Sequence, residues 1–61
     1  MTSMEAVHLI EPHARFCTWG DPDDLSGWVR GQDWETMIYA NEERAWKAAV
    51  ELLTVRMVVA R

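Results

Sequence analysis

The chain has 61 residues, of which 49% are hydrophobic and 26% are charged, a balance typical of a folded domain and not of a disordered segment. Its one cysteine excludes an internal disulfide and a four-cysteine zinc framework. The formal net charge of −4 comes from ten acidic and six basic side chains, which argues against direct nucleic-acid binding through a basic stripe. We expect a single domain over residues 1–61.

Short strands are predicted for the first half of the chain. Residues 6–10 are apolar and end at a Glu-Pro pair, which indicates a strand. Residues 15–19 are aromatic and β-favouring and stop at a glycine, so the first two strands would form a hairpin through residues 12–14. Residues 21–27 are dense in turn formers and predict a loop, with one helical turn capped by Asp21 as the alternative. Residues 28–30 would then be the third strand.

The segment at residues 34–39 is rich in β-branched and aromatic side chains and predicts another strand. In a regular strand, Trp34, Thr36 and Ile38 would share one face. A helix capped by Asp33 is the alternative for the same residues.

A C-terminal helix is the clearest element in the sequence. Asn41 is a favoured N-cap, and two glutamates follow it in the first turn. One apolar stripe runs along the helix through Trp46, Ala49, Val50, Leu53 and Met57. We expect the helix to continue to about Val59, with a final strand over residues 54–61 as the alternative. Together these elements predict an α+β fold, a small antiparallel meander of three or four strands packed by one C-terminal helix.

The acidic charge is concentrated in the middle of the chain. Residues 20–35 carry five acidic side chains against one arginine, so this segment alone has the net charge of the whole protein. Two of the four tryptophans lie in the same segment, and aromatic anchors rimmed by charge are typical of protein interfaces. We therefore predict a surface that binds a basic partner through Asp21, Asp23, Asp24, Trp28, Asp33, Trp34 and Glu35. The alternative is that Trp19, Trp28 and Trp34 pack into the core with Trp46.

Other candidate chemistry in the sequence is unconvincing. His8, His13 and Cys17 follow no standard zinc-ligand spacing. Cys17 with His13 lacks an orienting third group, and a chain this short hardly surrounds a substrate. The aspartates that begin at Asp21 fail the calcium-loop pattern, because they lack its glycine and its glutamate. We expect no catalytic, cofactor or metal site, and hence a protein that is not an enzyme.

The end of the C-terminal helix suggests a second contact surface. Its apolar side chains spread around more than one helical face, and one sheet covers only one stripe. A second copy of the chain would bury the excess through Val55, Met57, Val58 and Val59.

Residues 34–39 followed by residues 41–50 (NEERAWKAAV) resemble the strand-then-helix ending of some small phage proteins, among them anti-CRISPR inhibitors. The resemblance covers about half of the chain and carries over no individual binding residue. It implies a stoichiometric inhibitor in the cytoplasm that has no cofactor and imitates or excludes nucleic acid on a host complex.

The sequence as a whole predicts a non-enzymatic, acidic protein-binding module whose partner is a host protein or complex with a basic surface. We expect no direct contact with nucleic acid or membrane, since no stretch approaches the ~20 apolar residues that a membrane span needs. The alternative is a small structural or regulatory homo-oligomer with the helix as its dimer seam.

Overall fold

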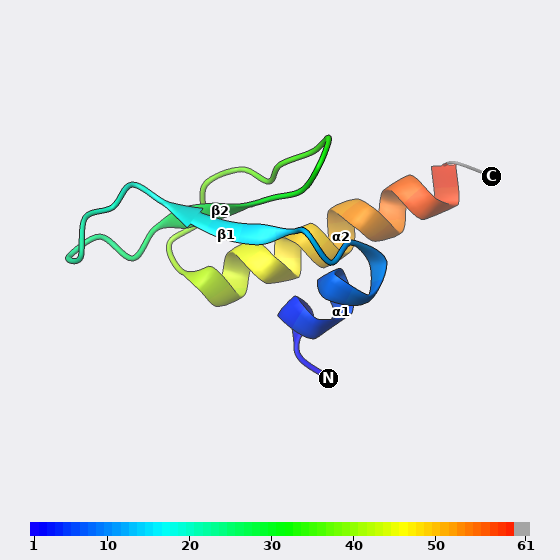
Figure 1. Cartoon of the computed structure of the whole chain (residues 1–61), viewed down its shortest axis with the longest axis horizontal. Helices are drawn as coiled ribbons and strands as arrows, with labels where there is room; N and C mark the ends of the chain where they lie inside the picture. Colours follow the sequence, from blue (N-terminus) through cyan, green and yellow to red (C-terminus); the bar gives the residue numbers. More distant parts are fainter. Residues whose placement is uncertain (60–61) are drawn as a thin grey trace.

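The computed structural model describes residues 1–59, with side chains through residue 56. The elements are α1 (Ser3–Ile10), β1 (Arg15–Thr18), β2 (Gly27–Arg30) and α2 (Glu42–Val59). In the described part of the chain, β1 and β2 form an antiparallel two-stranded sheet that lies along α2, and α1 packs on α2 and on neither strand (Figure 1). The expected α+β class is confirmed, but the sheet has two strands where three or four were expected.

The strand predicted at residues 6–10 is wrong, because this segment belongs to helix α1. The Thr2 hydroxyl caps the helix by accepting a hydrogen bond from the Glu5 backbone N–H at 3.1 Å. A threonine followed three residues later by glutamate is the sequence pattern of a capping box. The helix ends before proline, where the Glu11 N–H still donates to the Val7 carbonyl at 2.7 Å. Residues 12–14 therefore connect a helix to a strand and do not form a hairpin turn.

Helix α2 follows the sequence prediction. The Asn41 side chain accepts a hydrogen bond from the Arg44 N–H at 2.9 Å and caps the helix, which continues to Val59. From Trp46 to Leu53 its apolar stripe faces the other elements, and Trp46 is only 4% exposed. The whole core lies along this stripe and consists of Val7, Ala14, Val29, Ala45, Trp46, Ala49 and Leu53.

The β1–β2 hairpin has one covered and one open face. Its register pairs Phe16 with Val29, and these two side chains belong to or pack against the core over α2. Because side chains alternate along a strand, the neighbouring positions face away from α2. We call this side the open face, and it carries Arg15, Cys17, Trp28 and Arg30.

Residues 34–39 run back beside β2 but pair with it at only two points. The bridges join Gly27 to Tyr39 and Arg30 to Glu35. The returning segment thus spans four residue steps against three in β2, so it contains one extra residue. An extra residue bends a strand and breaks its ladder, as in a β-bulge. This explains why the segment expected as a strand forms only isolated bridges.

Thr36 holds the bulged segment to the sheet with its backbone and its side chain. Its N–H donates to the Val29 carbonyl at 2.9 Å, and its hydroxyl accepts from the Val29 N–H at 3.0 Å. The extra residue also breaks the expected alternation of faces. Trp34 and Tyr39 both pack against the core, whereas Ile38, which was expected on the same face as Trp34, is 54% exposed.

Replacing the Thr36 hydroxyl tests this arrangement. Thr36→Val keeps the shape but leaves the Val29 N–H without its partner, and an unsatisfied buried donor costs about 1–3 kcal/mol. Thr36→Ser keeps the hydroxyl and should cost less than about 1 kcal/mol. Urea denaturation measures both free energies of unfolding. Equal losses in the two variants would contradict the role of the hydroxyl.

Candidate functional site

The acidic loop, which carries Asp21, Asp23 and Asp24, forms the free end of the hairpin and projects to the left in Figure 1. Its carboxylates order their own backbone. The Asp21 side chain accepts from the Asp23 N–H at 2.9 Å, and the Asp24 side chain accepts from the Ser26 N–H at 3.0 Å and from its hydroxyl at 2.5 Å. The Ser26 hydroxyl, followed by its N–H, lowers the pKa of Asp24. The loop therefore presents fixed negative charge to solvent.

Further carboxylates lie beside the acidic loop. A hollow of about 450 Å³ is lined by Asp21 and Asp24 from the loop and by Glu42 and Glu43 from the first turn of α2. From the sequence, these glutamates were expected only to stabilise the helix dipole. Their place beside the loop depends on how the hairpin lies on α2, for which no local pattern exists.

An aromatic hollow lies on the open face near the same end of the hairpin. Trp19 and Trp28 pack with ring centroids 5.1 Å apart and planes tilted by 55°. With Glu35, Thr36, Met37 and Ile38 they line a shallow hollow of about 470 Å³. The Trp19 side chain is 60% exposed and that of Met37 is 79% exposed. Trp19 is therefore the most accessible aromatic group of this face, although the sequence analysis left it out of the predicted surface.

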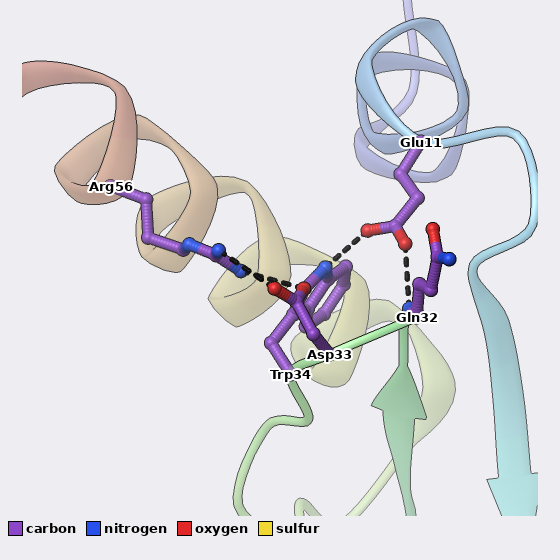
Figure 2. Close-up of polar contacts among 5 residues, drawn as sticks. All are labelled: Glu11, Gln32, Asp33, Trp34 and Arg56. Atoms are coloured by element: carbon purple, nitrogen blue, oxygen red, sulfur yellow. Dashed lines mark hydrogen bonds and ion pairs between the residues drawn. The ribbon is translucent and has the colours of Figure 1, made fainter. Parts of the chain in front are cut away.

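Asp33 and Trp34 lie at the opposite end of β2, in and after the turn at residues 31–33 (Figure 2). Both oxygens of Asp33 accept from the Arg56 guanidinium, at 3.0 and 3.1 Å. The Glu11 carboxylate accepts from the Trp34 indole N–H and, at 2.6 Å, from the Gln32 N–H. We call these contacts the turn clamp, because they tie the turn to the end of α1 and to α2.

The turn clamp requires glycine at position 31. A Cβ on Gly31 would overlap the Trp34 ring and lie 2.6 Å from a Glu11 carboxylate oxygen. The indole therefore lies directly against the backbone of the turn, where its N–H reaches Glu11.

The seven residues of the predicted surface thus separate into two groups. The structure gathers Asp21, Asp23 and Asp24 at the free end of the hairpin and places Trp28 and Glu35 in the aromatic hollow. Asp33 and Trp34 instead contact residues of their own chain in the turn clamp. The three tryptophans for which core packing was the alternative to an interface also differ. Trp34 packs against the core, Trp28 is half-buried and Trp19 is exposed.

Of the remaining candidates, His8 occupies a structural position. His8 contacts the Ala14 carbonyl through Nε2 at 2.9 Å, and its ring meets Trp46 edge-on. Because a carbonyl only accepts, Nε2 carries the proton. Val55 is 61% exposed on α2, whereas the side chains of Met57, Val58 and Val59 lie outside the described residues.

Within residues 1–59, no three His, Cys, Asp or Glu side chains are grouped so that they could hold a metal ion. Neither α1 nor the described part of α2 combines the length and apolar character that crossing a membrane requires. Comparisons with protein-family models, with curated proteins and with solved structures find no match for this chain.

The turn clamp predicts a specific loss of stability in acid. The Arg56 guanidinium lowers the pKa of Asp33 below its usual 3.8, so the pair stabilises the fold above that pH and the contribution is lost as pH falls through the lower folded-state value. Asp33→Asn should therefore unfold at a lower temperature than the wild type at pH 7, and the two melting temperatures should converge as the pH falls below 3.8.

Circular dichroism melting between pH 7 and pH 2.5 measures this difference. Glu51→Gln removes an exposed carboxylate elsewhere on α2 and is the matched control. High salt should reduce the difference in melting temperature between Asp33→Asn and the wild type at pH 7, since the side chains of Asp33 and Arg56 are both at least half exposed. A difference in melting temperature between Asp33→Asn and the wild type that stays constant down to pH 2.5 would refute a stabilising ion pair between Asp33 and Arg56.

Proposed function

We propose that this protein is a non-enzymatic binding module that occupies a basic surface of a partner protein through the free end of its hairpin. The binding end comprises the acidic loop and the aromatic hollow. The observation that carries the proposal is the exposed Trp19, packed on the half-buried Trp28, next to a loop of three aspartates.

Exposing Trp19 leaves free energy available for binding. Burial of a tryptophan removes about 150–250 Å² from water, which contributes roughly 4–6 kcal/mol. With Trp19 60% exposed, more than half of that stabilisation is absent from the free chain. A partner that covers the aromatic hollow would recover it, as hot-spot aromatics do at protein interfaces.

The charge around the aromatic hollow favours a basic partner. Glu35 lines the aromatic hollow itself, and the acidic loop begins two residues after Trp19 in the chain. Complementary charge suppresses wrong partners and fixes the register of an interface. Carboxylates beside an aromatic centre therefore fit a surface rich in arginine and lysine.

A narrower form of this proposal rests on the sequence resemblance of residues 34–39 and 41–50 to the strand-then-helix ending of some anti-CRISPR proteins, of which this chain has the helix and a bulged segment in place of the strand. In that form the protein acts in the cytoplasm as a stoichiometric inhibitor of a host nucleic-acid-binding complex. The fixed carboxylates of the acidic loop take the place of backbone phosphates on the basic surface of that complex, and they exclude the nucleic acid.

Neutralising the acidic loop without unfolding it tests the proposal. In Asp21→Asn/Asp24→Asn, each amide oxygen can still accept the loop hydrogen bonds while both charges are lost. The Kd for a host complex captured on the wild-type protein should rise roughly tenfold or more, because charge-assisted contacts are lost. Trp19→Ala should weaken binding to a similar or greater extent.

Glu5→Gln/Glu51→Gln removes two exposed charges outside the binding end and is the matched control. This control should leave the Kd for the captured host complex unchanged. Nucleic acid should compete with the wild-type protein for binding to that complex. Phage plating on a host with an active CRISPR system tests the inhibitory role, since expression of the wild-type protein should restore plaques. Equal binding by the control and the acidic-loop variant would reject the proposed surface.

A homo-oligomer with α2 as its seam is the second candidate, and it is favoured by the exposure of Val55 on that helix. An aliphatic residue at such a position gains burial from a second copy. Light scattering should then give twice the mass of one chain at high concentration, and Val55→Lys should return it to a single chain. A constant single-chain mass across concentrations would eliminate this candidate.

A further inference from the structure

A second hollow on the open face is lined mainly by hydrogen-bond donors. It has a volume of about 580 Å³ and lies at the end of the hairpin away from the acidic loop. Its lining residues are His13, Arg15, Cys17, Arg30, Gly31 and Gln32. None of them is acidic, although ten of the 61 side chains of this protein are. We call it the arginine hollow.

Two arginines face each other directly across the strands in this hollow. The register pairs Arg15 of β1 with Arg30 of β2, and both lie on the open face. Residues opposite each other in an antiparallel pair have Cα atoms only about 4.5–5.5 Å apart. Like charges at such positions destabilise a sheet, so this pair is unfavourable for folding alone.

Neither arginine forms an ion pair in the described part of the chain, where the one ion pair joins Asp33 to Arg56. Glu35 is bridged to Arg30 on the other side of β2, yet it lines the aromatic hollow and not this one. The Glu11 carboxylate is occupied by Gln32 and Trp34. Arg15 and Arg30 are thus free of ion pairs, and the register sets their Cα atoms directly opposite each other.

We propose that the arginine hollow binds a phosphate group. Guanidinium groups are planar donor forks that match phosphate oxygens in two-point contacts, and two adjacent forks match a dianion. His13 and Gln32 line the same hollow and add nitrogen donors. Binding also removes the repulsion between Arg15 and Arg30, because the anion is shared by both.

The phosphate has two chemical sources, inorganic phosphate or the phosphate of a nucleotide. The base of a nucleotide would find a contact surface on the same face, because Cys17 and Trp28 form the next open-face pair along the hairpin. That pair is two residues further along each strand, or about 7 Å away. The phosphate site itself shares no residue with the proposed binding end, and only the ring of a nucleotide would reach Trp28, which lines the aromatic hollow.

Titrations followed by ¹H–¹⁵N NMR test the site in low-salt chloride buffer, with inorganic phosphate, adenosine monophosphate and adenosine as probes. We expect saturable shifts of the Arg15 and Arg30 side-chain N–H signals with both phosphates and none with adenosine. Tighter binding of the monophosphate identifies a nucleotide source, and equal or tighter binding of phosphate identifies the inorganic anion.

Arg15→Gln/Arg30→Gln should weaken phosphate binding roughly tenfold or more, whereas Arg44→Gln, an exposed arginine on α2, should not change it. Thermal melting distinguishes phosphate binding from a purely structural role of the two arginines. Without phosphate, Arg15→Gln should melt above the wild type, because it relieves the repulsion. Added phosphate should raise the melting temperature of the wild type more than that of the double variant.

Three outcomes would overturn the proposal. The first is the absence of saturable shifts at Arg15 and Arg30 with either phosphate. The second is that adenosine shifts these signals as the monophosphate does. The third is that Arg44→Gln weakens binding as much as the double variant, which would mean that the anion only screens the surface.

Discussion

Burial of Trp46 is the interaction on which the rest of the structure depends. Helix α2 is the one described element that contacts all the others, and Trp46 is the largest side chain of its buried stripe. The indole N–H donates to Glu42 at 2.9 Å, and the ring is met edge-on by His8 of α1. Aromatic burial of this kind has the largest effect in a small domain, where little other apolar surface is available.

Small side chains beside Trp46 allow the other elements to approach α2. Ala45 and Ala49 are fully buried, and the fully buried Val7 and Val29 come from α1 and β2. The core is therefore thin and lies on one helix, so only one face of the hairpin takes part in it. The consequence for function is direct, because the aromatic hollow and the arginine hollow both lie along the face that the core leaves open.

The sequence was informative where the controlling interactions are local. The Asn41 cap and the period of the apolar stripe predicted α2, and β-favouring residues predicted both hairpin strands. Residues 6–10 were misread because a short apolar run fits a strand or a helix equally well. The deciding signal was the Thr2–Glu5 spacing, which lies before that run.

The candidate site was harder to predict, because its composition depends on contacts between distant residues. Asp33 and Trp34 bind partners 23 residues away in the sequence, so no local pattern separates them from the exposed aspartates. The extra residue near Thr36 shifts the alternation of side chains, so that Ile38 is exposed where it was expected on the core side. This extra residue is defined only by the pairing with β2. Arg15 and Arg30 were overlooked for the same reason, since only the register makes them neighbours.

The positions of the charges along the hairpin have a consequence for how the molecule moves. Three aspartates occupy one end of this long, narrow element and two arginines the other. The hairpin therefore has a dipole moment along its own length, independent of the net charge. The electric field of a charged macromolecule rotates a molecule with such a dipole before the two touch. The field therefore determines which end of the hairpin makes the first contact.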